Sequence, residues 1–246
     1  MEKFNLNLPK MKSSEIFTSY IARVAVTNAL DLKALCRITD IKALNLKCAL
    51  SSYDRICGLF KLNKSKSEIV FENTSMKLYK TMLLKSEFND DGLPNPEHMN
   101  ELNDLFTPMI CPLCAKEDYL KVGHPIRYVH HNYYGIKACT KHRAKLEGFY
   151  DFGRITPDLF EAKPATDEDV EIAEWFIKLS NQETESAVKL IMDHLNELHD
   201  RLDDYSYNDR SIIFTASRMK SLQRLPIIYR MRLCELIRQL EKQQAK

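Results

Sequence analysis

The chain has 246 residues, of which 44% are hydrophobic, a length and composition that suit one large folded domain or two small ones. The formal net charge is +2, and no stretch resembles a signal peptide or is apolar for long enough to span a bilayer. The seven cysteines are unevenly spread, which argues against a secreted disulfide scaffold and for a reducing compartment where clustered cysteines bind metal. We therefore expect a protein of a reducing cytosol.

The N-terminal part carries patterns typical of short helices. Ser14 can cap a helix whose apolar residues recur at intervals of three and four, and Asp31 can cap a second, shorter one. Asn28 suits the turn between them, and further short helices are expected over 41–50 and 51–60. Short helices joined by tight turns are compatible with a helix-turn-helix unit and equally with a plain helical bundle.

The helical pattern of the N-terminal part is interrupted before the next module. The stretch Asp-Asp-Gly-Leu-Pro-Asn-Pro, from Asp90 to Pro96, predicts a loop that leads toward a separate module over about 107–150. That module is rich in aromatic and basic residues, and their alternation favours the short strands of a zinc ribbon, which is too small to build a full core.

Two pairs of potential metal ligands lie in this module, one with CxxC and one with CxxH spacing, and 24 residues separate them. Each pair can provide two ligands to the same tetrahedral zinc ion from a single tight turn. The loop between the pairs brings the second pair back to the first. Four protein ligands close the coordination shell, which disfavours a hydrolytic zinc. The predicted ligands are Cys111, Cys114, Cys139 and His142, with His130 or His131 as alternatives to His142, whereas Cys36, Cys48, Cys57 and Cys234 are expected to be ordinary thiols.

After Pro164 the pattern becomes helical again. One predicted helix carries Trp175, Phe176 and Leu179, and a second carries an apolar stripe from Ala187 to Leu202. Stripes of this kind are more often core than interface.

The charges of the C-terminal part are divided into two blocks. From Lys163 to Asp204 there are 12 acidic and four basic residues, whereas from Arg210 to Lys246 there are nine basic and two acidic residues. The blocks are either solvated helix faces or, for the basic one, a surface that meets nucleic acid or an acidic partner.

These patterns predict a mainly α fold with a small β-containing zinc ribbon. We expect three parts: an N-terminal helical, helix-turn-helix-like unit over 1–95, a zinc-finger module over 96–160 and a C-terminal helical region over 161–246.

Three segments carry a further signal. Pro9 precedes SEIFTSYIARVAVTNALDL (Ser14 to Leu32), YDRICGLFKL follows (Tyr53 to Leu62), and CPLC at Cys111 is followed by a stretch ending in HHNYYGIKACTKHRAKL at Leu146. In this order they resemble the TniQ/TnsD family of transposon target-selection proteins.

Three departures mark the chain as a divergent member of the family that it resembles. The aromatic-Trp-Arg element that usually follows the CxxC is here Asp118-Tyr119-Leu120-Lys121. The glycine that commonly follows the metal-binding histidine is Arg143, and the usual Asn-Gly turn after the first helix is Asn28-Ala29.

The resemblance implies a non-catalytic adaptor that marks a DNA target, directly or through an RNA-guided CRISPR effector complex, and recruits an AAA+ ATPase and its transposase. Zinc would be structural, and self-association is a further possibility. Roughly 95 residues follow the module, fewer than in relatives that read attachment-site DNA, so we expect limited DNA contact. The candidate phosphate contacts are Arg127, Lys137, Lys141 and Arg143.

Two other functions fit the residues less well. One is a stand-alone zinc-containing, sequence-specific DNA-binding protein that uses the N-terminal helices and the ribbon. The other is an HNH-like nuclease, suggested by His130-His131-Asn132. Such a nuclease needs a further asparagine and histidine downstream, and the next asparagine, Asn181, lies beyond the module.

Overall fold

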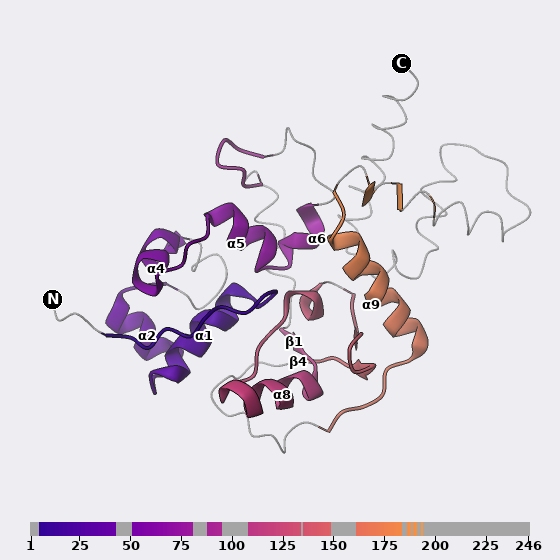
Figure 1. Ribbon diagram of the computed structural model, residues 1–246, viewed down its shortest axis with the longest axis horizontal. Coiled ribbons are helices and arrows are strands. Elements are labelled where there is room, and N and C mark those ends of the chain that lie inside the picture. Colours follow the sequence, from indigo (N-terminus) through magenta and orange to yellow (C-terminus); the bar gives the residue numbers. More distant parts are fainter. Residues whose placement is uncertain are drawn as a thin grey trace, which may run out of the picture.

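The computed structural model describes residues 5–42, 51–80, 88–94, 108–133, 135–148, 161–183, 186–187, 189–190 and 193. Within them, short helices form the N-terminal part, a small module combines helical segments with paired strands, and a longer helix follows (Figure 1). The helices are α1 (Phe17–Thr27), α2 (Leu32–Thr39), α4 (Tyr53–Phe60), α5 (Lys66–Glu72), α6 (Met76–Lys80), α8 (Pro112–Val122), the 3-10 helix η2 (Val129–Asn132) and α9 (Asp167–Ser180). Among the described residues, no helix has the length and apolar character needed to cross a membrane.

The strands of the module are only two residues long and pair antiparallel. β1 (Met109–Ile110) pairs with β4 (Glu147–Gly148), and β2 (Ala138–Cys139) pairs with β3 (Ala144–Lys145). The expected fold class, mainly helical with a small β-containing module, is confirmed. The strands that the module's alternation predicts are present, but α8 was not expected and occupies the segment after the first cysteine.

The prediction that Ser14 caps the first helix is wrong. α1 begins at Phe17, and no side chain caps it. Ser14 has a φ of 57°, and its carbonyl oxygen accepts a hydrogen bond from the backbone N–H of Val129, 2.8 Å away. The prediction for Asp31 is confirmed, because its Oδ1 accepts a hydrogen bond from the backbone N–H of Ala34 at 2.6 Å.

A single hydrophobic core joins the N-terminal helices, the metal module and α9. Tyr20 of α1 meets Phe60 of α4 edge to face, with ring centroids 6.1 Å apart. The helix predicted around Trp175 is confirmed as α9, which buries Phe176 and Leu179 and packs against α6 and β2.

Other predictions concern segments at the edge of the described residues. The loop predicted from Asp90 to Pro96 is confirmed for 90–94, where Gly92 adopts a φ of 68° in a turn, and 95–96 lie outside the described residues. Most of 41–50, most of the stripe from Ala187 to Leu202 and the basic block after Arg210 lie outside the described residues.

The N-terminal unit and the metal module meet in a hydrogen-bonded junction around Glu15, which pairs as an isolated antiparallel bridge with Tyr128. Ile16 donates its backbone N–H to the carbonyl of Arg127 at 2.9 Å, and Asn73 donates its side-chain amide to the carbonyl of Glu15 at 2.8 Å. Three segments distant in sequence therefore meet at one residue.

A buried ion pair stabilises this junction. The Glu15 side chain is 0% exposed and that of Arg23 3%, and the guanidinium donates Nε to Oε1 at 3.0 Å and Nη2 to Oε2 at 2.7 Å. Oε2 also accepts the backbone N–H of Lys12 at 2.9 Å, and Arg23 Nη2 donates to the carbonyl of Lys10 at 2.9 Å. These additional hydrogen bonds are what a buried pair needs to offset desolvation.

We predict that Arg23→Ala lowers the free energy of unfolding by about 3–5 kcal/mol, because it leaves the Glu15 carboxylate buried without its counter-charge. Urea unfolding followed by circular dichroism measures the change. The control is Arg55→Ala, which breaks the exposed pair with Asp40 and a hydrogen bond to the carbonyl of Thr39 and should cost only about 1–2 kcal/mol. Equal effects of the two variants would contradict the role given to the buried pair.

Helix α1 ends with Ala29 in a left-handed backbone conformation. Leu30 donates its backbone N–H to the carbonyl of Ala25 and Ala29 donates to that of Val26, both at 2.9 Å, which is a Schellman ending with Ala29 at a φ of 55°. This left-handed position favours glycine, because a Cβ costs about 1–2 kcal/mol there.

We therefore expect Ala29→Gly to raise the free energy of unfolding by up to about 1 kcal/mol, since the extra freedom of glycine in the unfolded chain removes about 0.4–1 kcal/mol of the gain. The control is Ala34→Gly within α2, which should destabilise by about 0.5–1 kcal/mol. Thermal or urea unfolding of both variants tests the sign, and a loss of stability in Ala29→Gly would contradict the expectation.

Candidate metal centre

Helix α8 positions the first ligand pair. Cys111 is its N-cap and Cys114 lies in its first turn, so both side chains are presented at the start of the helix. Pro112 occupies the first helical position, where its fixed φ favours helix initiation and its missing N–H has no intrahelical partner to lose. Gly123, at a φ of 72°, ends the helix.

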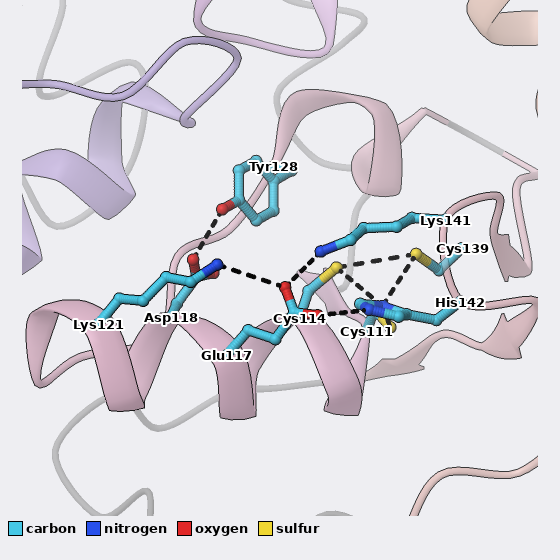
Figure 2. Close-up of polar contacts among 9 residues, drawn as sticks. All are labelled: Cys111, Cys114, Glu117, Asp118, Lys121, Tyr128, Cys139, Lys141 and His142. Atoms are coloured by element: carbon cyan, nitrogen blue, oxygen red, sulfur yellow. Dashed lines mark hydrogen bonds and ion pairs between the residues drawn. The ribbon is translucent and has the colours of Figure 1, made fainter.

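The second pair comes from the β2–β3 hairpin. Cys139 ends β2, and His142 lies in the turn before β3. The hairpin places both side chains over the start of α8 (Figure 2). One ligand atom from each of the four predicted residues lies within 4.8 Å of the others, and the three cysteines are buried.

The separations within this cluster fit a tetrahedral metal ion. Nδ1 of His142 lies 3.5 Å, 3.3 Å and 3.8 Å from Sγ of Cys111, Cys114 and Cys139 respectively, and the last two sulfurs are 3.8 Å apart. Bonds of about 2.3 Å to sulfur and 2.0–2.1 Å to nitrogen at tetrahedral angles imply edges of roughly 3.8 Å between two sulfurs and 3.6 Å between sulfur and nitrogen. The four residues can therefore bind a metal ion with little rearrangement.

Hydrogen bonding couples the protonation of the three thiols. Hydrogen bonds from Cys111 and then Cys114 lower the pKa of Cys139, whereas hydrogen bonding to Cys111 and then Cys139 raises the pKa of Cys114. The hydrogen bond with Cys114 lowers the pKa of Cys111. The hydrogen bond with Cys139 and burial together have the larger effect and raise the pKa of Cys111 to about 11. The cluster thus holds protons that a divalent ion would displace.

The alternative ligands have other positions. His131 is 0% exposed and lies beside Cys139, where it helps to lower the pKa of that thiol, but it does not belong to the four-ligand cluster. His130 packs against it with ring centroids 4.4 Å apart, and burial, followed by the charge of His131, lowers the pKa of His130 to about 4. His142 is therefore the histidine that completes the cluster.

This packing also weighs against the nuclease interpretation. The Asn132 side chain accepts the backbone N–H of Met109 at 2.9 Å and donates to the carbonyls of Met109 and Tyr128 at 3.0 and 2.9 Å. It therefore holds η2 against β1, and His131 is fully buried. In the part of the chain that the structure describes, Asn132 thus has a structural role.

The four predicted phosphate contacts occupy different environments. Arg127 is partly buried at the junction, where its Nη2 donates to Thr18 Oγ1 at 3.1 Å and burial lowers its pKa to about 10. Lys137, Lys141 and Arg143 are exposed around the β2–β3 hairpin, with Lys141 paired to Glu117 and Arg143 to Asp167. Phosphate contact by any of the four stays a prediction.

Sequence reasoning missed two side chains of α8 that face its neighbours. Glu117 contacts His142, and Asp118 accepts a hydrogen bond from the Tyr128 hydroxyl at 2.8 Å (Figure 2). Pro112 at the start and Gly123 at the end were the available signals for the helix. Once α8 is recognised, the three-residue spacing places Glu117 on the same face as Cys114.

The family model described as TniQ matches residues 7–146, which is more than half of the chain. The chain belongs to the TniQ family. The match spans the N-terminal helices, the junction and the whole metal cluster. Neither the search of curated proteins nor the search of solved structures gives a match.

Membership assigns a target-selection role associated with transposition, in a family that is generally non-catalytic. Two departures of this TniQ chain lie at left-handed positions: Ala29 at a φ of 55° and Arg143 at 49°, where glycine is favoured. Both sites therefore retain the backbone conformation that a glycine would adopt without strain.

We predict that Cys111→Ser weakens Zn²⁺ binding by at least about 60-fold. Structural zinc binds with about 10 kcal/mol or more, so an equal share for each of four ligands is about 2.5 kcal/mol. Competition with a chromophoric chelator measures the affinity. The control is Cys57→Ser, a half-buried thiol outside the cluster, which should bind Zn²⁺ like the wild type. Equal affinities for all three proteins would contradict the assignment.

Proposed function

We propose that the protein is a non-catalytic adaptor of DNA transposition that links a target, either DNA itself or an RNA-guided effector complex, to an AAA+ ATPase and its transposase. The observation that carries the proposal is the TniQ match over 7–146, which includes all four residues of the metal cluster. The adaptor role is more specific than the target-selection role that membership assigns, and the module's architecture supports it.

The donor set favours zinc. Three thiolates and one imidazole in a tetrahedral arrangement suit Zn²⁺, because hard cations prefer oxygen ligands. Zinc bound by four protein side chains has no open position for a substrate or for an activated water molecule. The same arrangement therefore supports a structural ion and a protein that does not hydrolyse its target.

The junction supports a recruitment platform. Backbone hydrogen bonds at Ile16 and Val129 join α1 to the metal module, so surfaces of both parts are held in a fixed relation. An adaptor that binds a target and an ATPase at once needs such a relation between two surfaces. On α8, Leu120 is 74% exposed in the segment where the resemblance expects an aromatic-Trp-Arg element, which makes this helix a candidate partner surface.

A second function is supported by one observation. The exposed cations Lys137, Lys141 and Arg143 surround the hairpin that carries half of the metal cluster, and such a surface suits phosphate contact. On this alternative the protein binds a DNA sequence by itself, and recruitment is secondary.

Binding measurements with and without the ATPase distinguish the two functions. We predict that the adaptor binds an AAA+ ATPase encoded with it at micromolar or tighter affinity and binds DNA alone weakly and without sequence preference. Sequence-specific DNA binding in isolation would favour the alternative. Binding to neither the ATPase, DNA nor an effector complex would contradict both.

The cations allow a sharper test. If all three contact phosphate, replacing Lys137, Lys141 and Arg143 by glutamine should reduce the slope of log affinity against log salt by about 0.9 per contact, measured by fluorescence anisotropy with duplex DNA. Lys178→Gln, an exposed cation on α9, is the control and should leave the slope unchanged. An unchanged slope in the triple variant would remove the hairpin from the DNA interface.

A further inference from the structure

The imidazole of His142 is held at both of its nitrogens. Nδ1 faces the three thiols at 3.3–3.8 Å, and Nε2, on the opposite edge of the ring, lies 2.9 Å from Oε1 of Glu117. The histidine side chain is only 14% exposed, so little water competes for Nε2. Figure 2 shows Glu117 on α8, next to Cys114, with its carboxylate joined to the ring of His142.

This arrangement selects one tautomer. A neutral imidazole has one N–H and one lone pair, and a carboxylate can only accept, so Nε2 carries the proton and Nδ1 presents its lone pair to the cluster. We propose that Glu117 is a positioning residue of the metal centre, which fixes the tautomer and the ring orientation of His142 for ligation through Nδ1. The proposal rests on the zinc centre of the proposed function.

The other oxygen of Glu117 keeps the carboxylate in place. Oε2 pairs with Nζ of Lys141, from the turn that carries His142, and lies 3.8 Å from Nζ of Lys121, one helical turn further along α8.

Sequence position explains why this residue can act on a ligand 25 positions away. Cys114 and Glu117 are three residues apart on α8 and so share a helix face, and the hairpin lays His142 across that face. One helix turn thus supplies both a metal ligand and the group that orients another.

Zinc competition with Glu117→Ala and Glu117→Gln tests the proposal. We expect Glu117→Ala to weaken Zn²⁺ binding about 10–100-fold, the usual effect of losing such a partner. Glu117→Gln retains an acceptor oxygen without charge and should lose less. Nitrogen-15 NMR of the zinc-loaded protein should show metal at Nδ1 and a proton at Nε2 of His142, with the Nε2 signal shifted in both variants.

A matched control separates the position of Glu117 from its charge. Glu174→Gln removes an exposed carboxylate on α9 and should bind Zn²⁺ within about twofold of wild type. Wild-type affinity in Glu117→Ala, or an equal loss in Glu174→Gln, would overturn the proposal, as would zinc bound at Nε2. If Glu117→Ala does not fold, wild-type affinity in Glu117→Gln would overturn it. If the wild type itself binds no Zn²⁺, the zinc centre fails instead.

Discussion

Four side chains from two distant turns converge on one point in this chain, and the architecture of the metal module depends on them. The strand pairs there are two residues long, and a pair of that size has little stability of its own. Three buried thiols and an imidazole at tetrahedral separations supply a much larger constraint if they share an ion, since structural zinc contributes about 10–16 kcal/mol. That is comparable to the whole stability of an ordinary domain.

The constraint extends beyond the cluster through α8. The helix that Cys111 caps carries Asp118 one turn after Cys114, and Asp118 accepts a hydrogen bond from the hydroxyl of Tyr128. The backbone of Tyr128 pairs with Glu15, whose carboxylate holds Arg23 of α1. A continuous set of contacts thus leads from the metal ligands to the first helix.

The local parts of this account could be predicted from the sequence. The CxxC and CxxH spacings identified the cluster because ligand pairs are properties of single turns, and Asp31 could be recognised as a cap for the same reason. Ser14 looked like a cap too, but its carbonyl is used by Val129, more than 100 residues away, and a tertiary contact of that kind leaves no periodic signal.

The sequence likewise showed Glu15 and Arg23 only as members of a family motif and did not indicate their structural roles. Their eight-residue spacing does not indicate that the pair is buried or that Tyr128 pairs with Glu15. Glu117 was missed because the aromatic and basic alternation of the module favoured strands over a helix, although Pro112 and Gly123 marked the helix ends.

Hydrogen exchange of the zinc-loaded and chelator-treated protein tests the central claim most directly, because it reports on each part of the chain separately. The account predicts that chelation removes protection from α8 and both strand pairs, and also from the backbone N–H groups of Ile16 and Val129 at the junction, while the amide of Ile56 in α4 stays protected. Unchanged protection in the metal module after complete removal of the metal would contradict it.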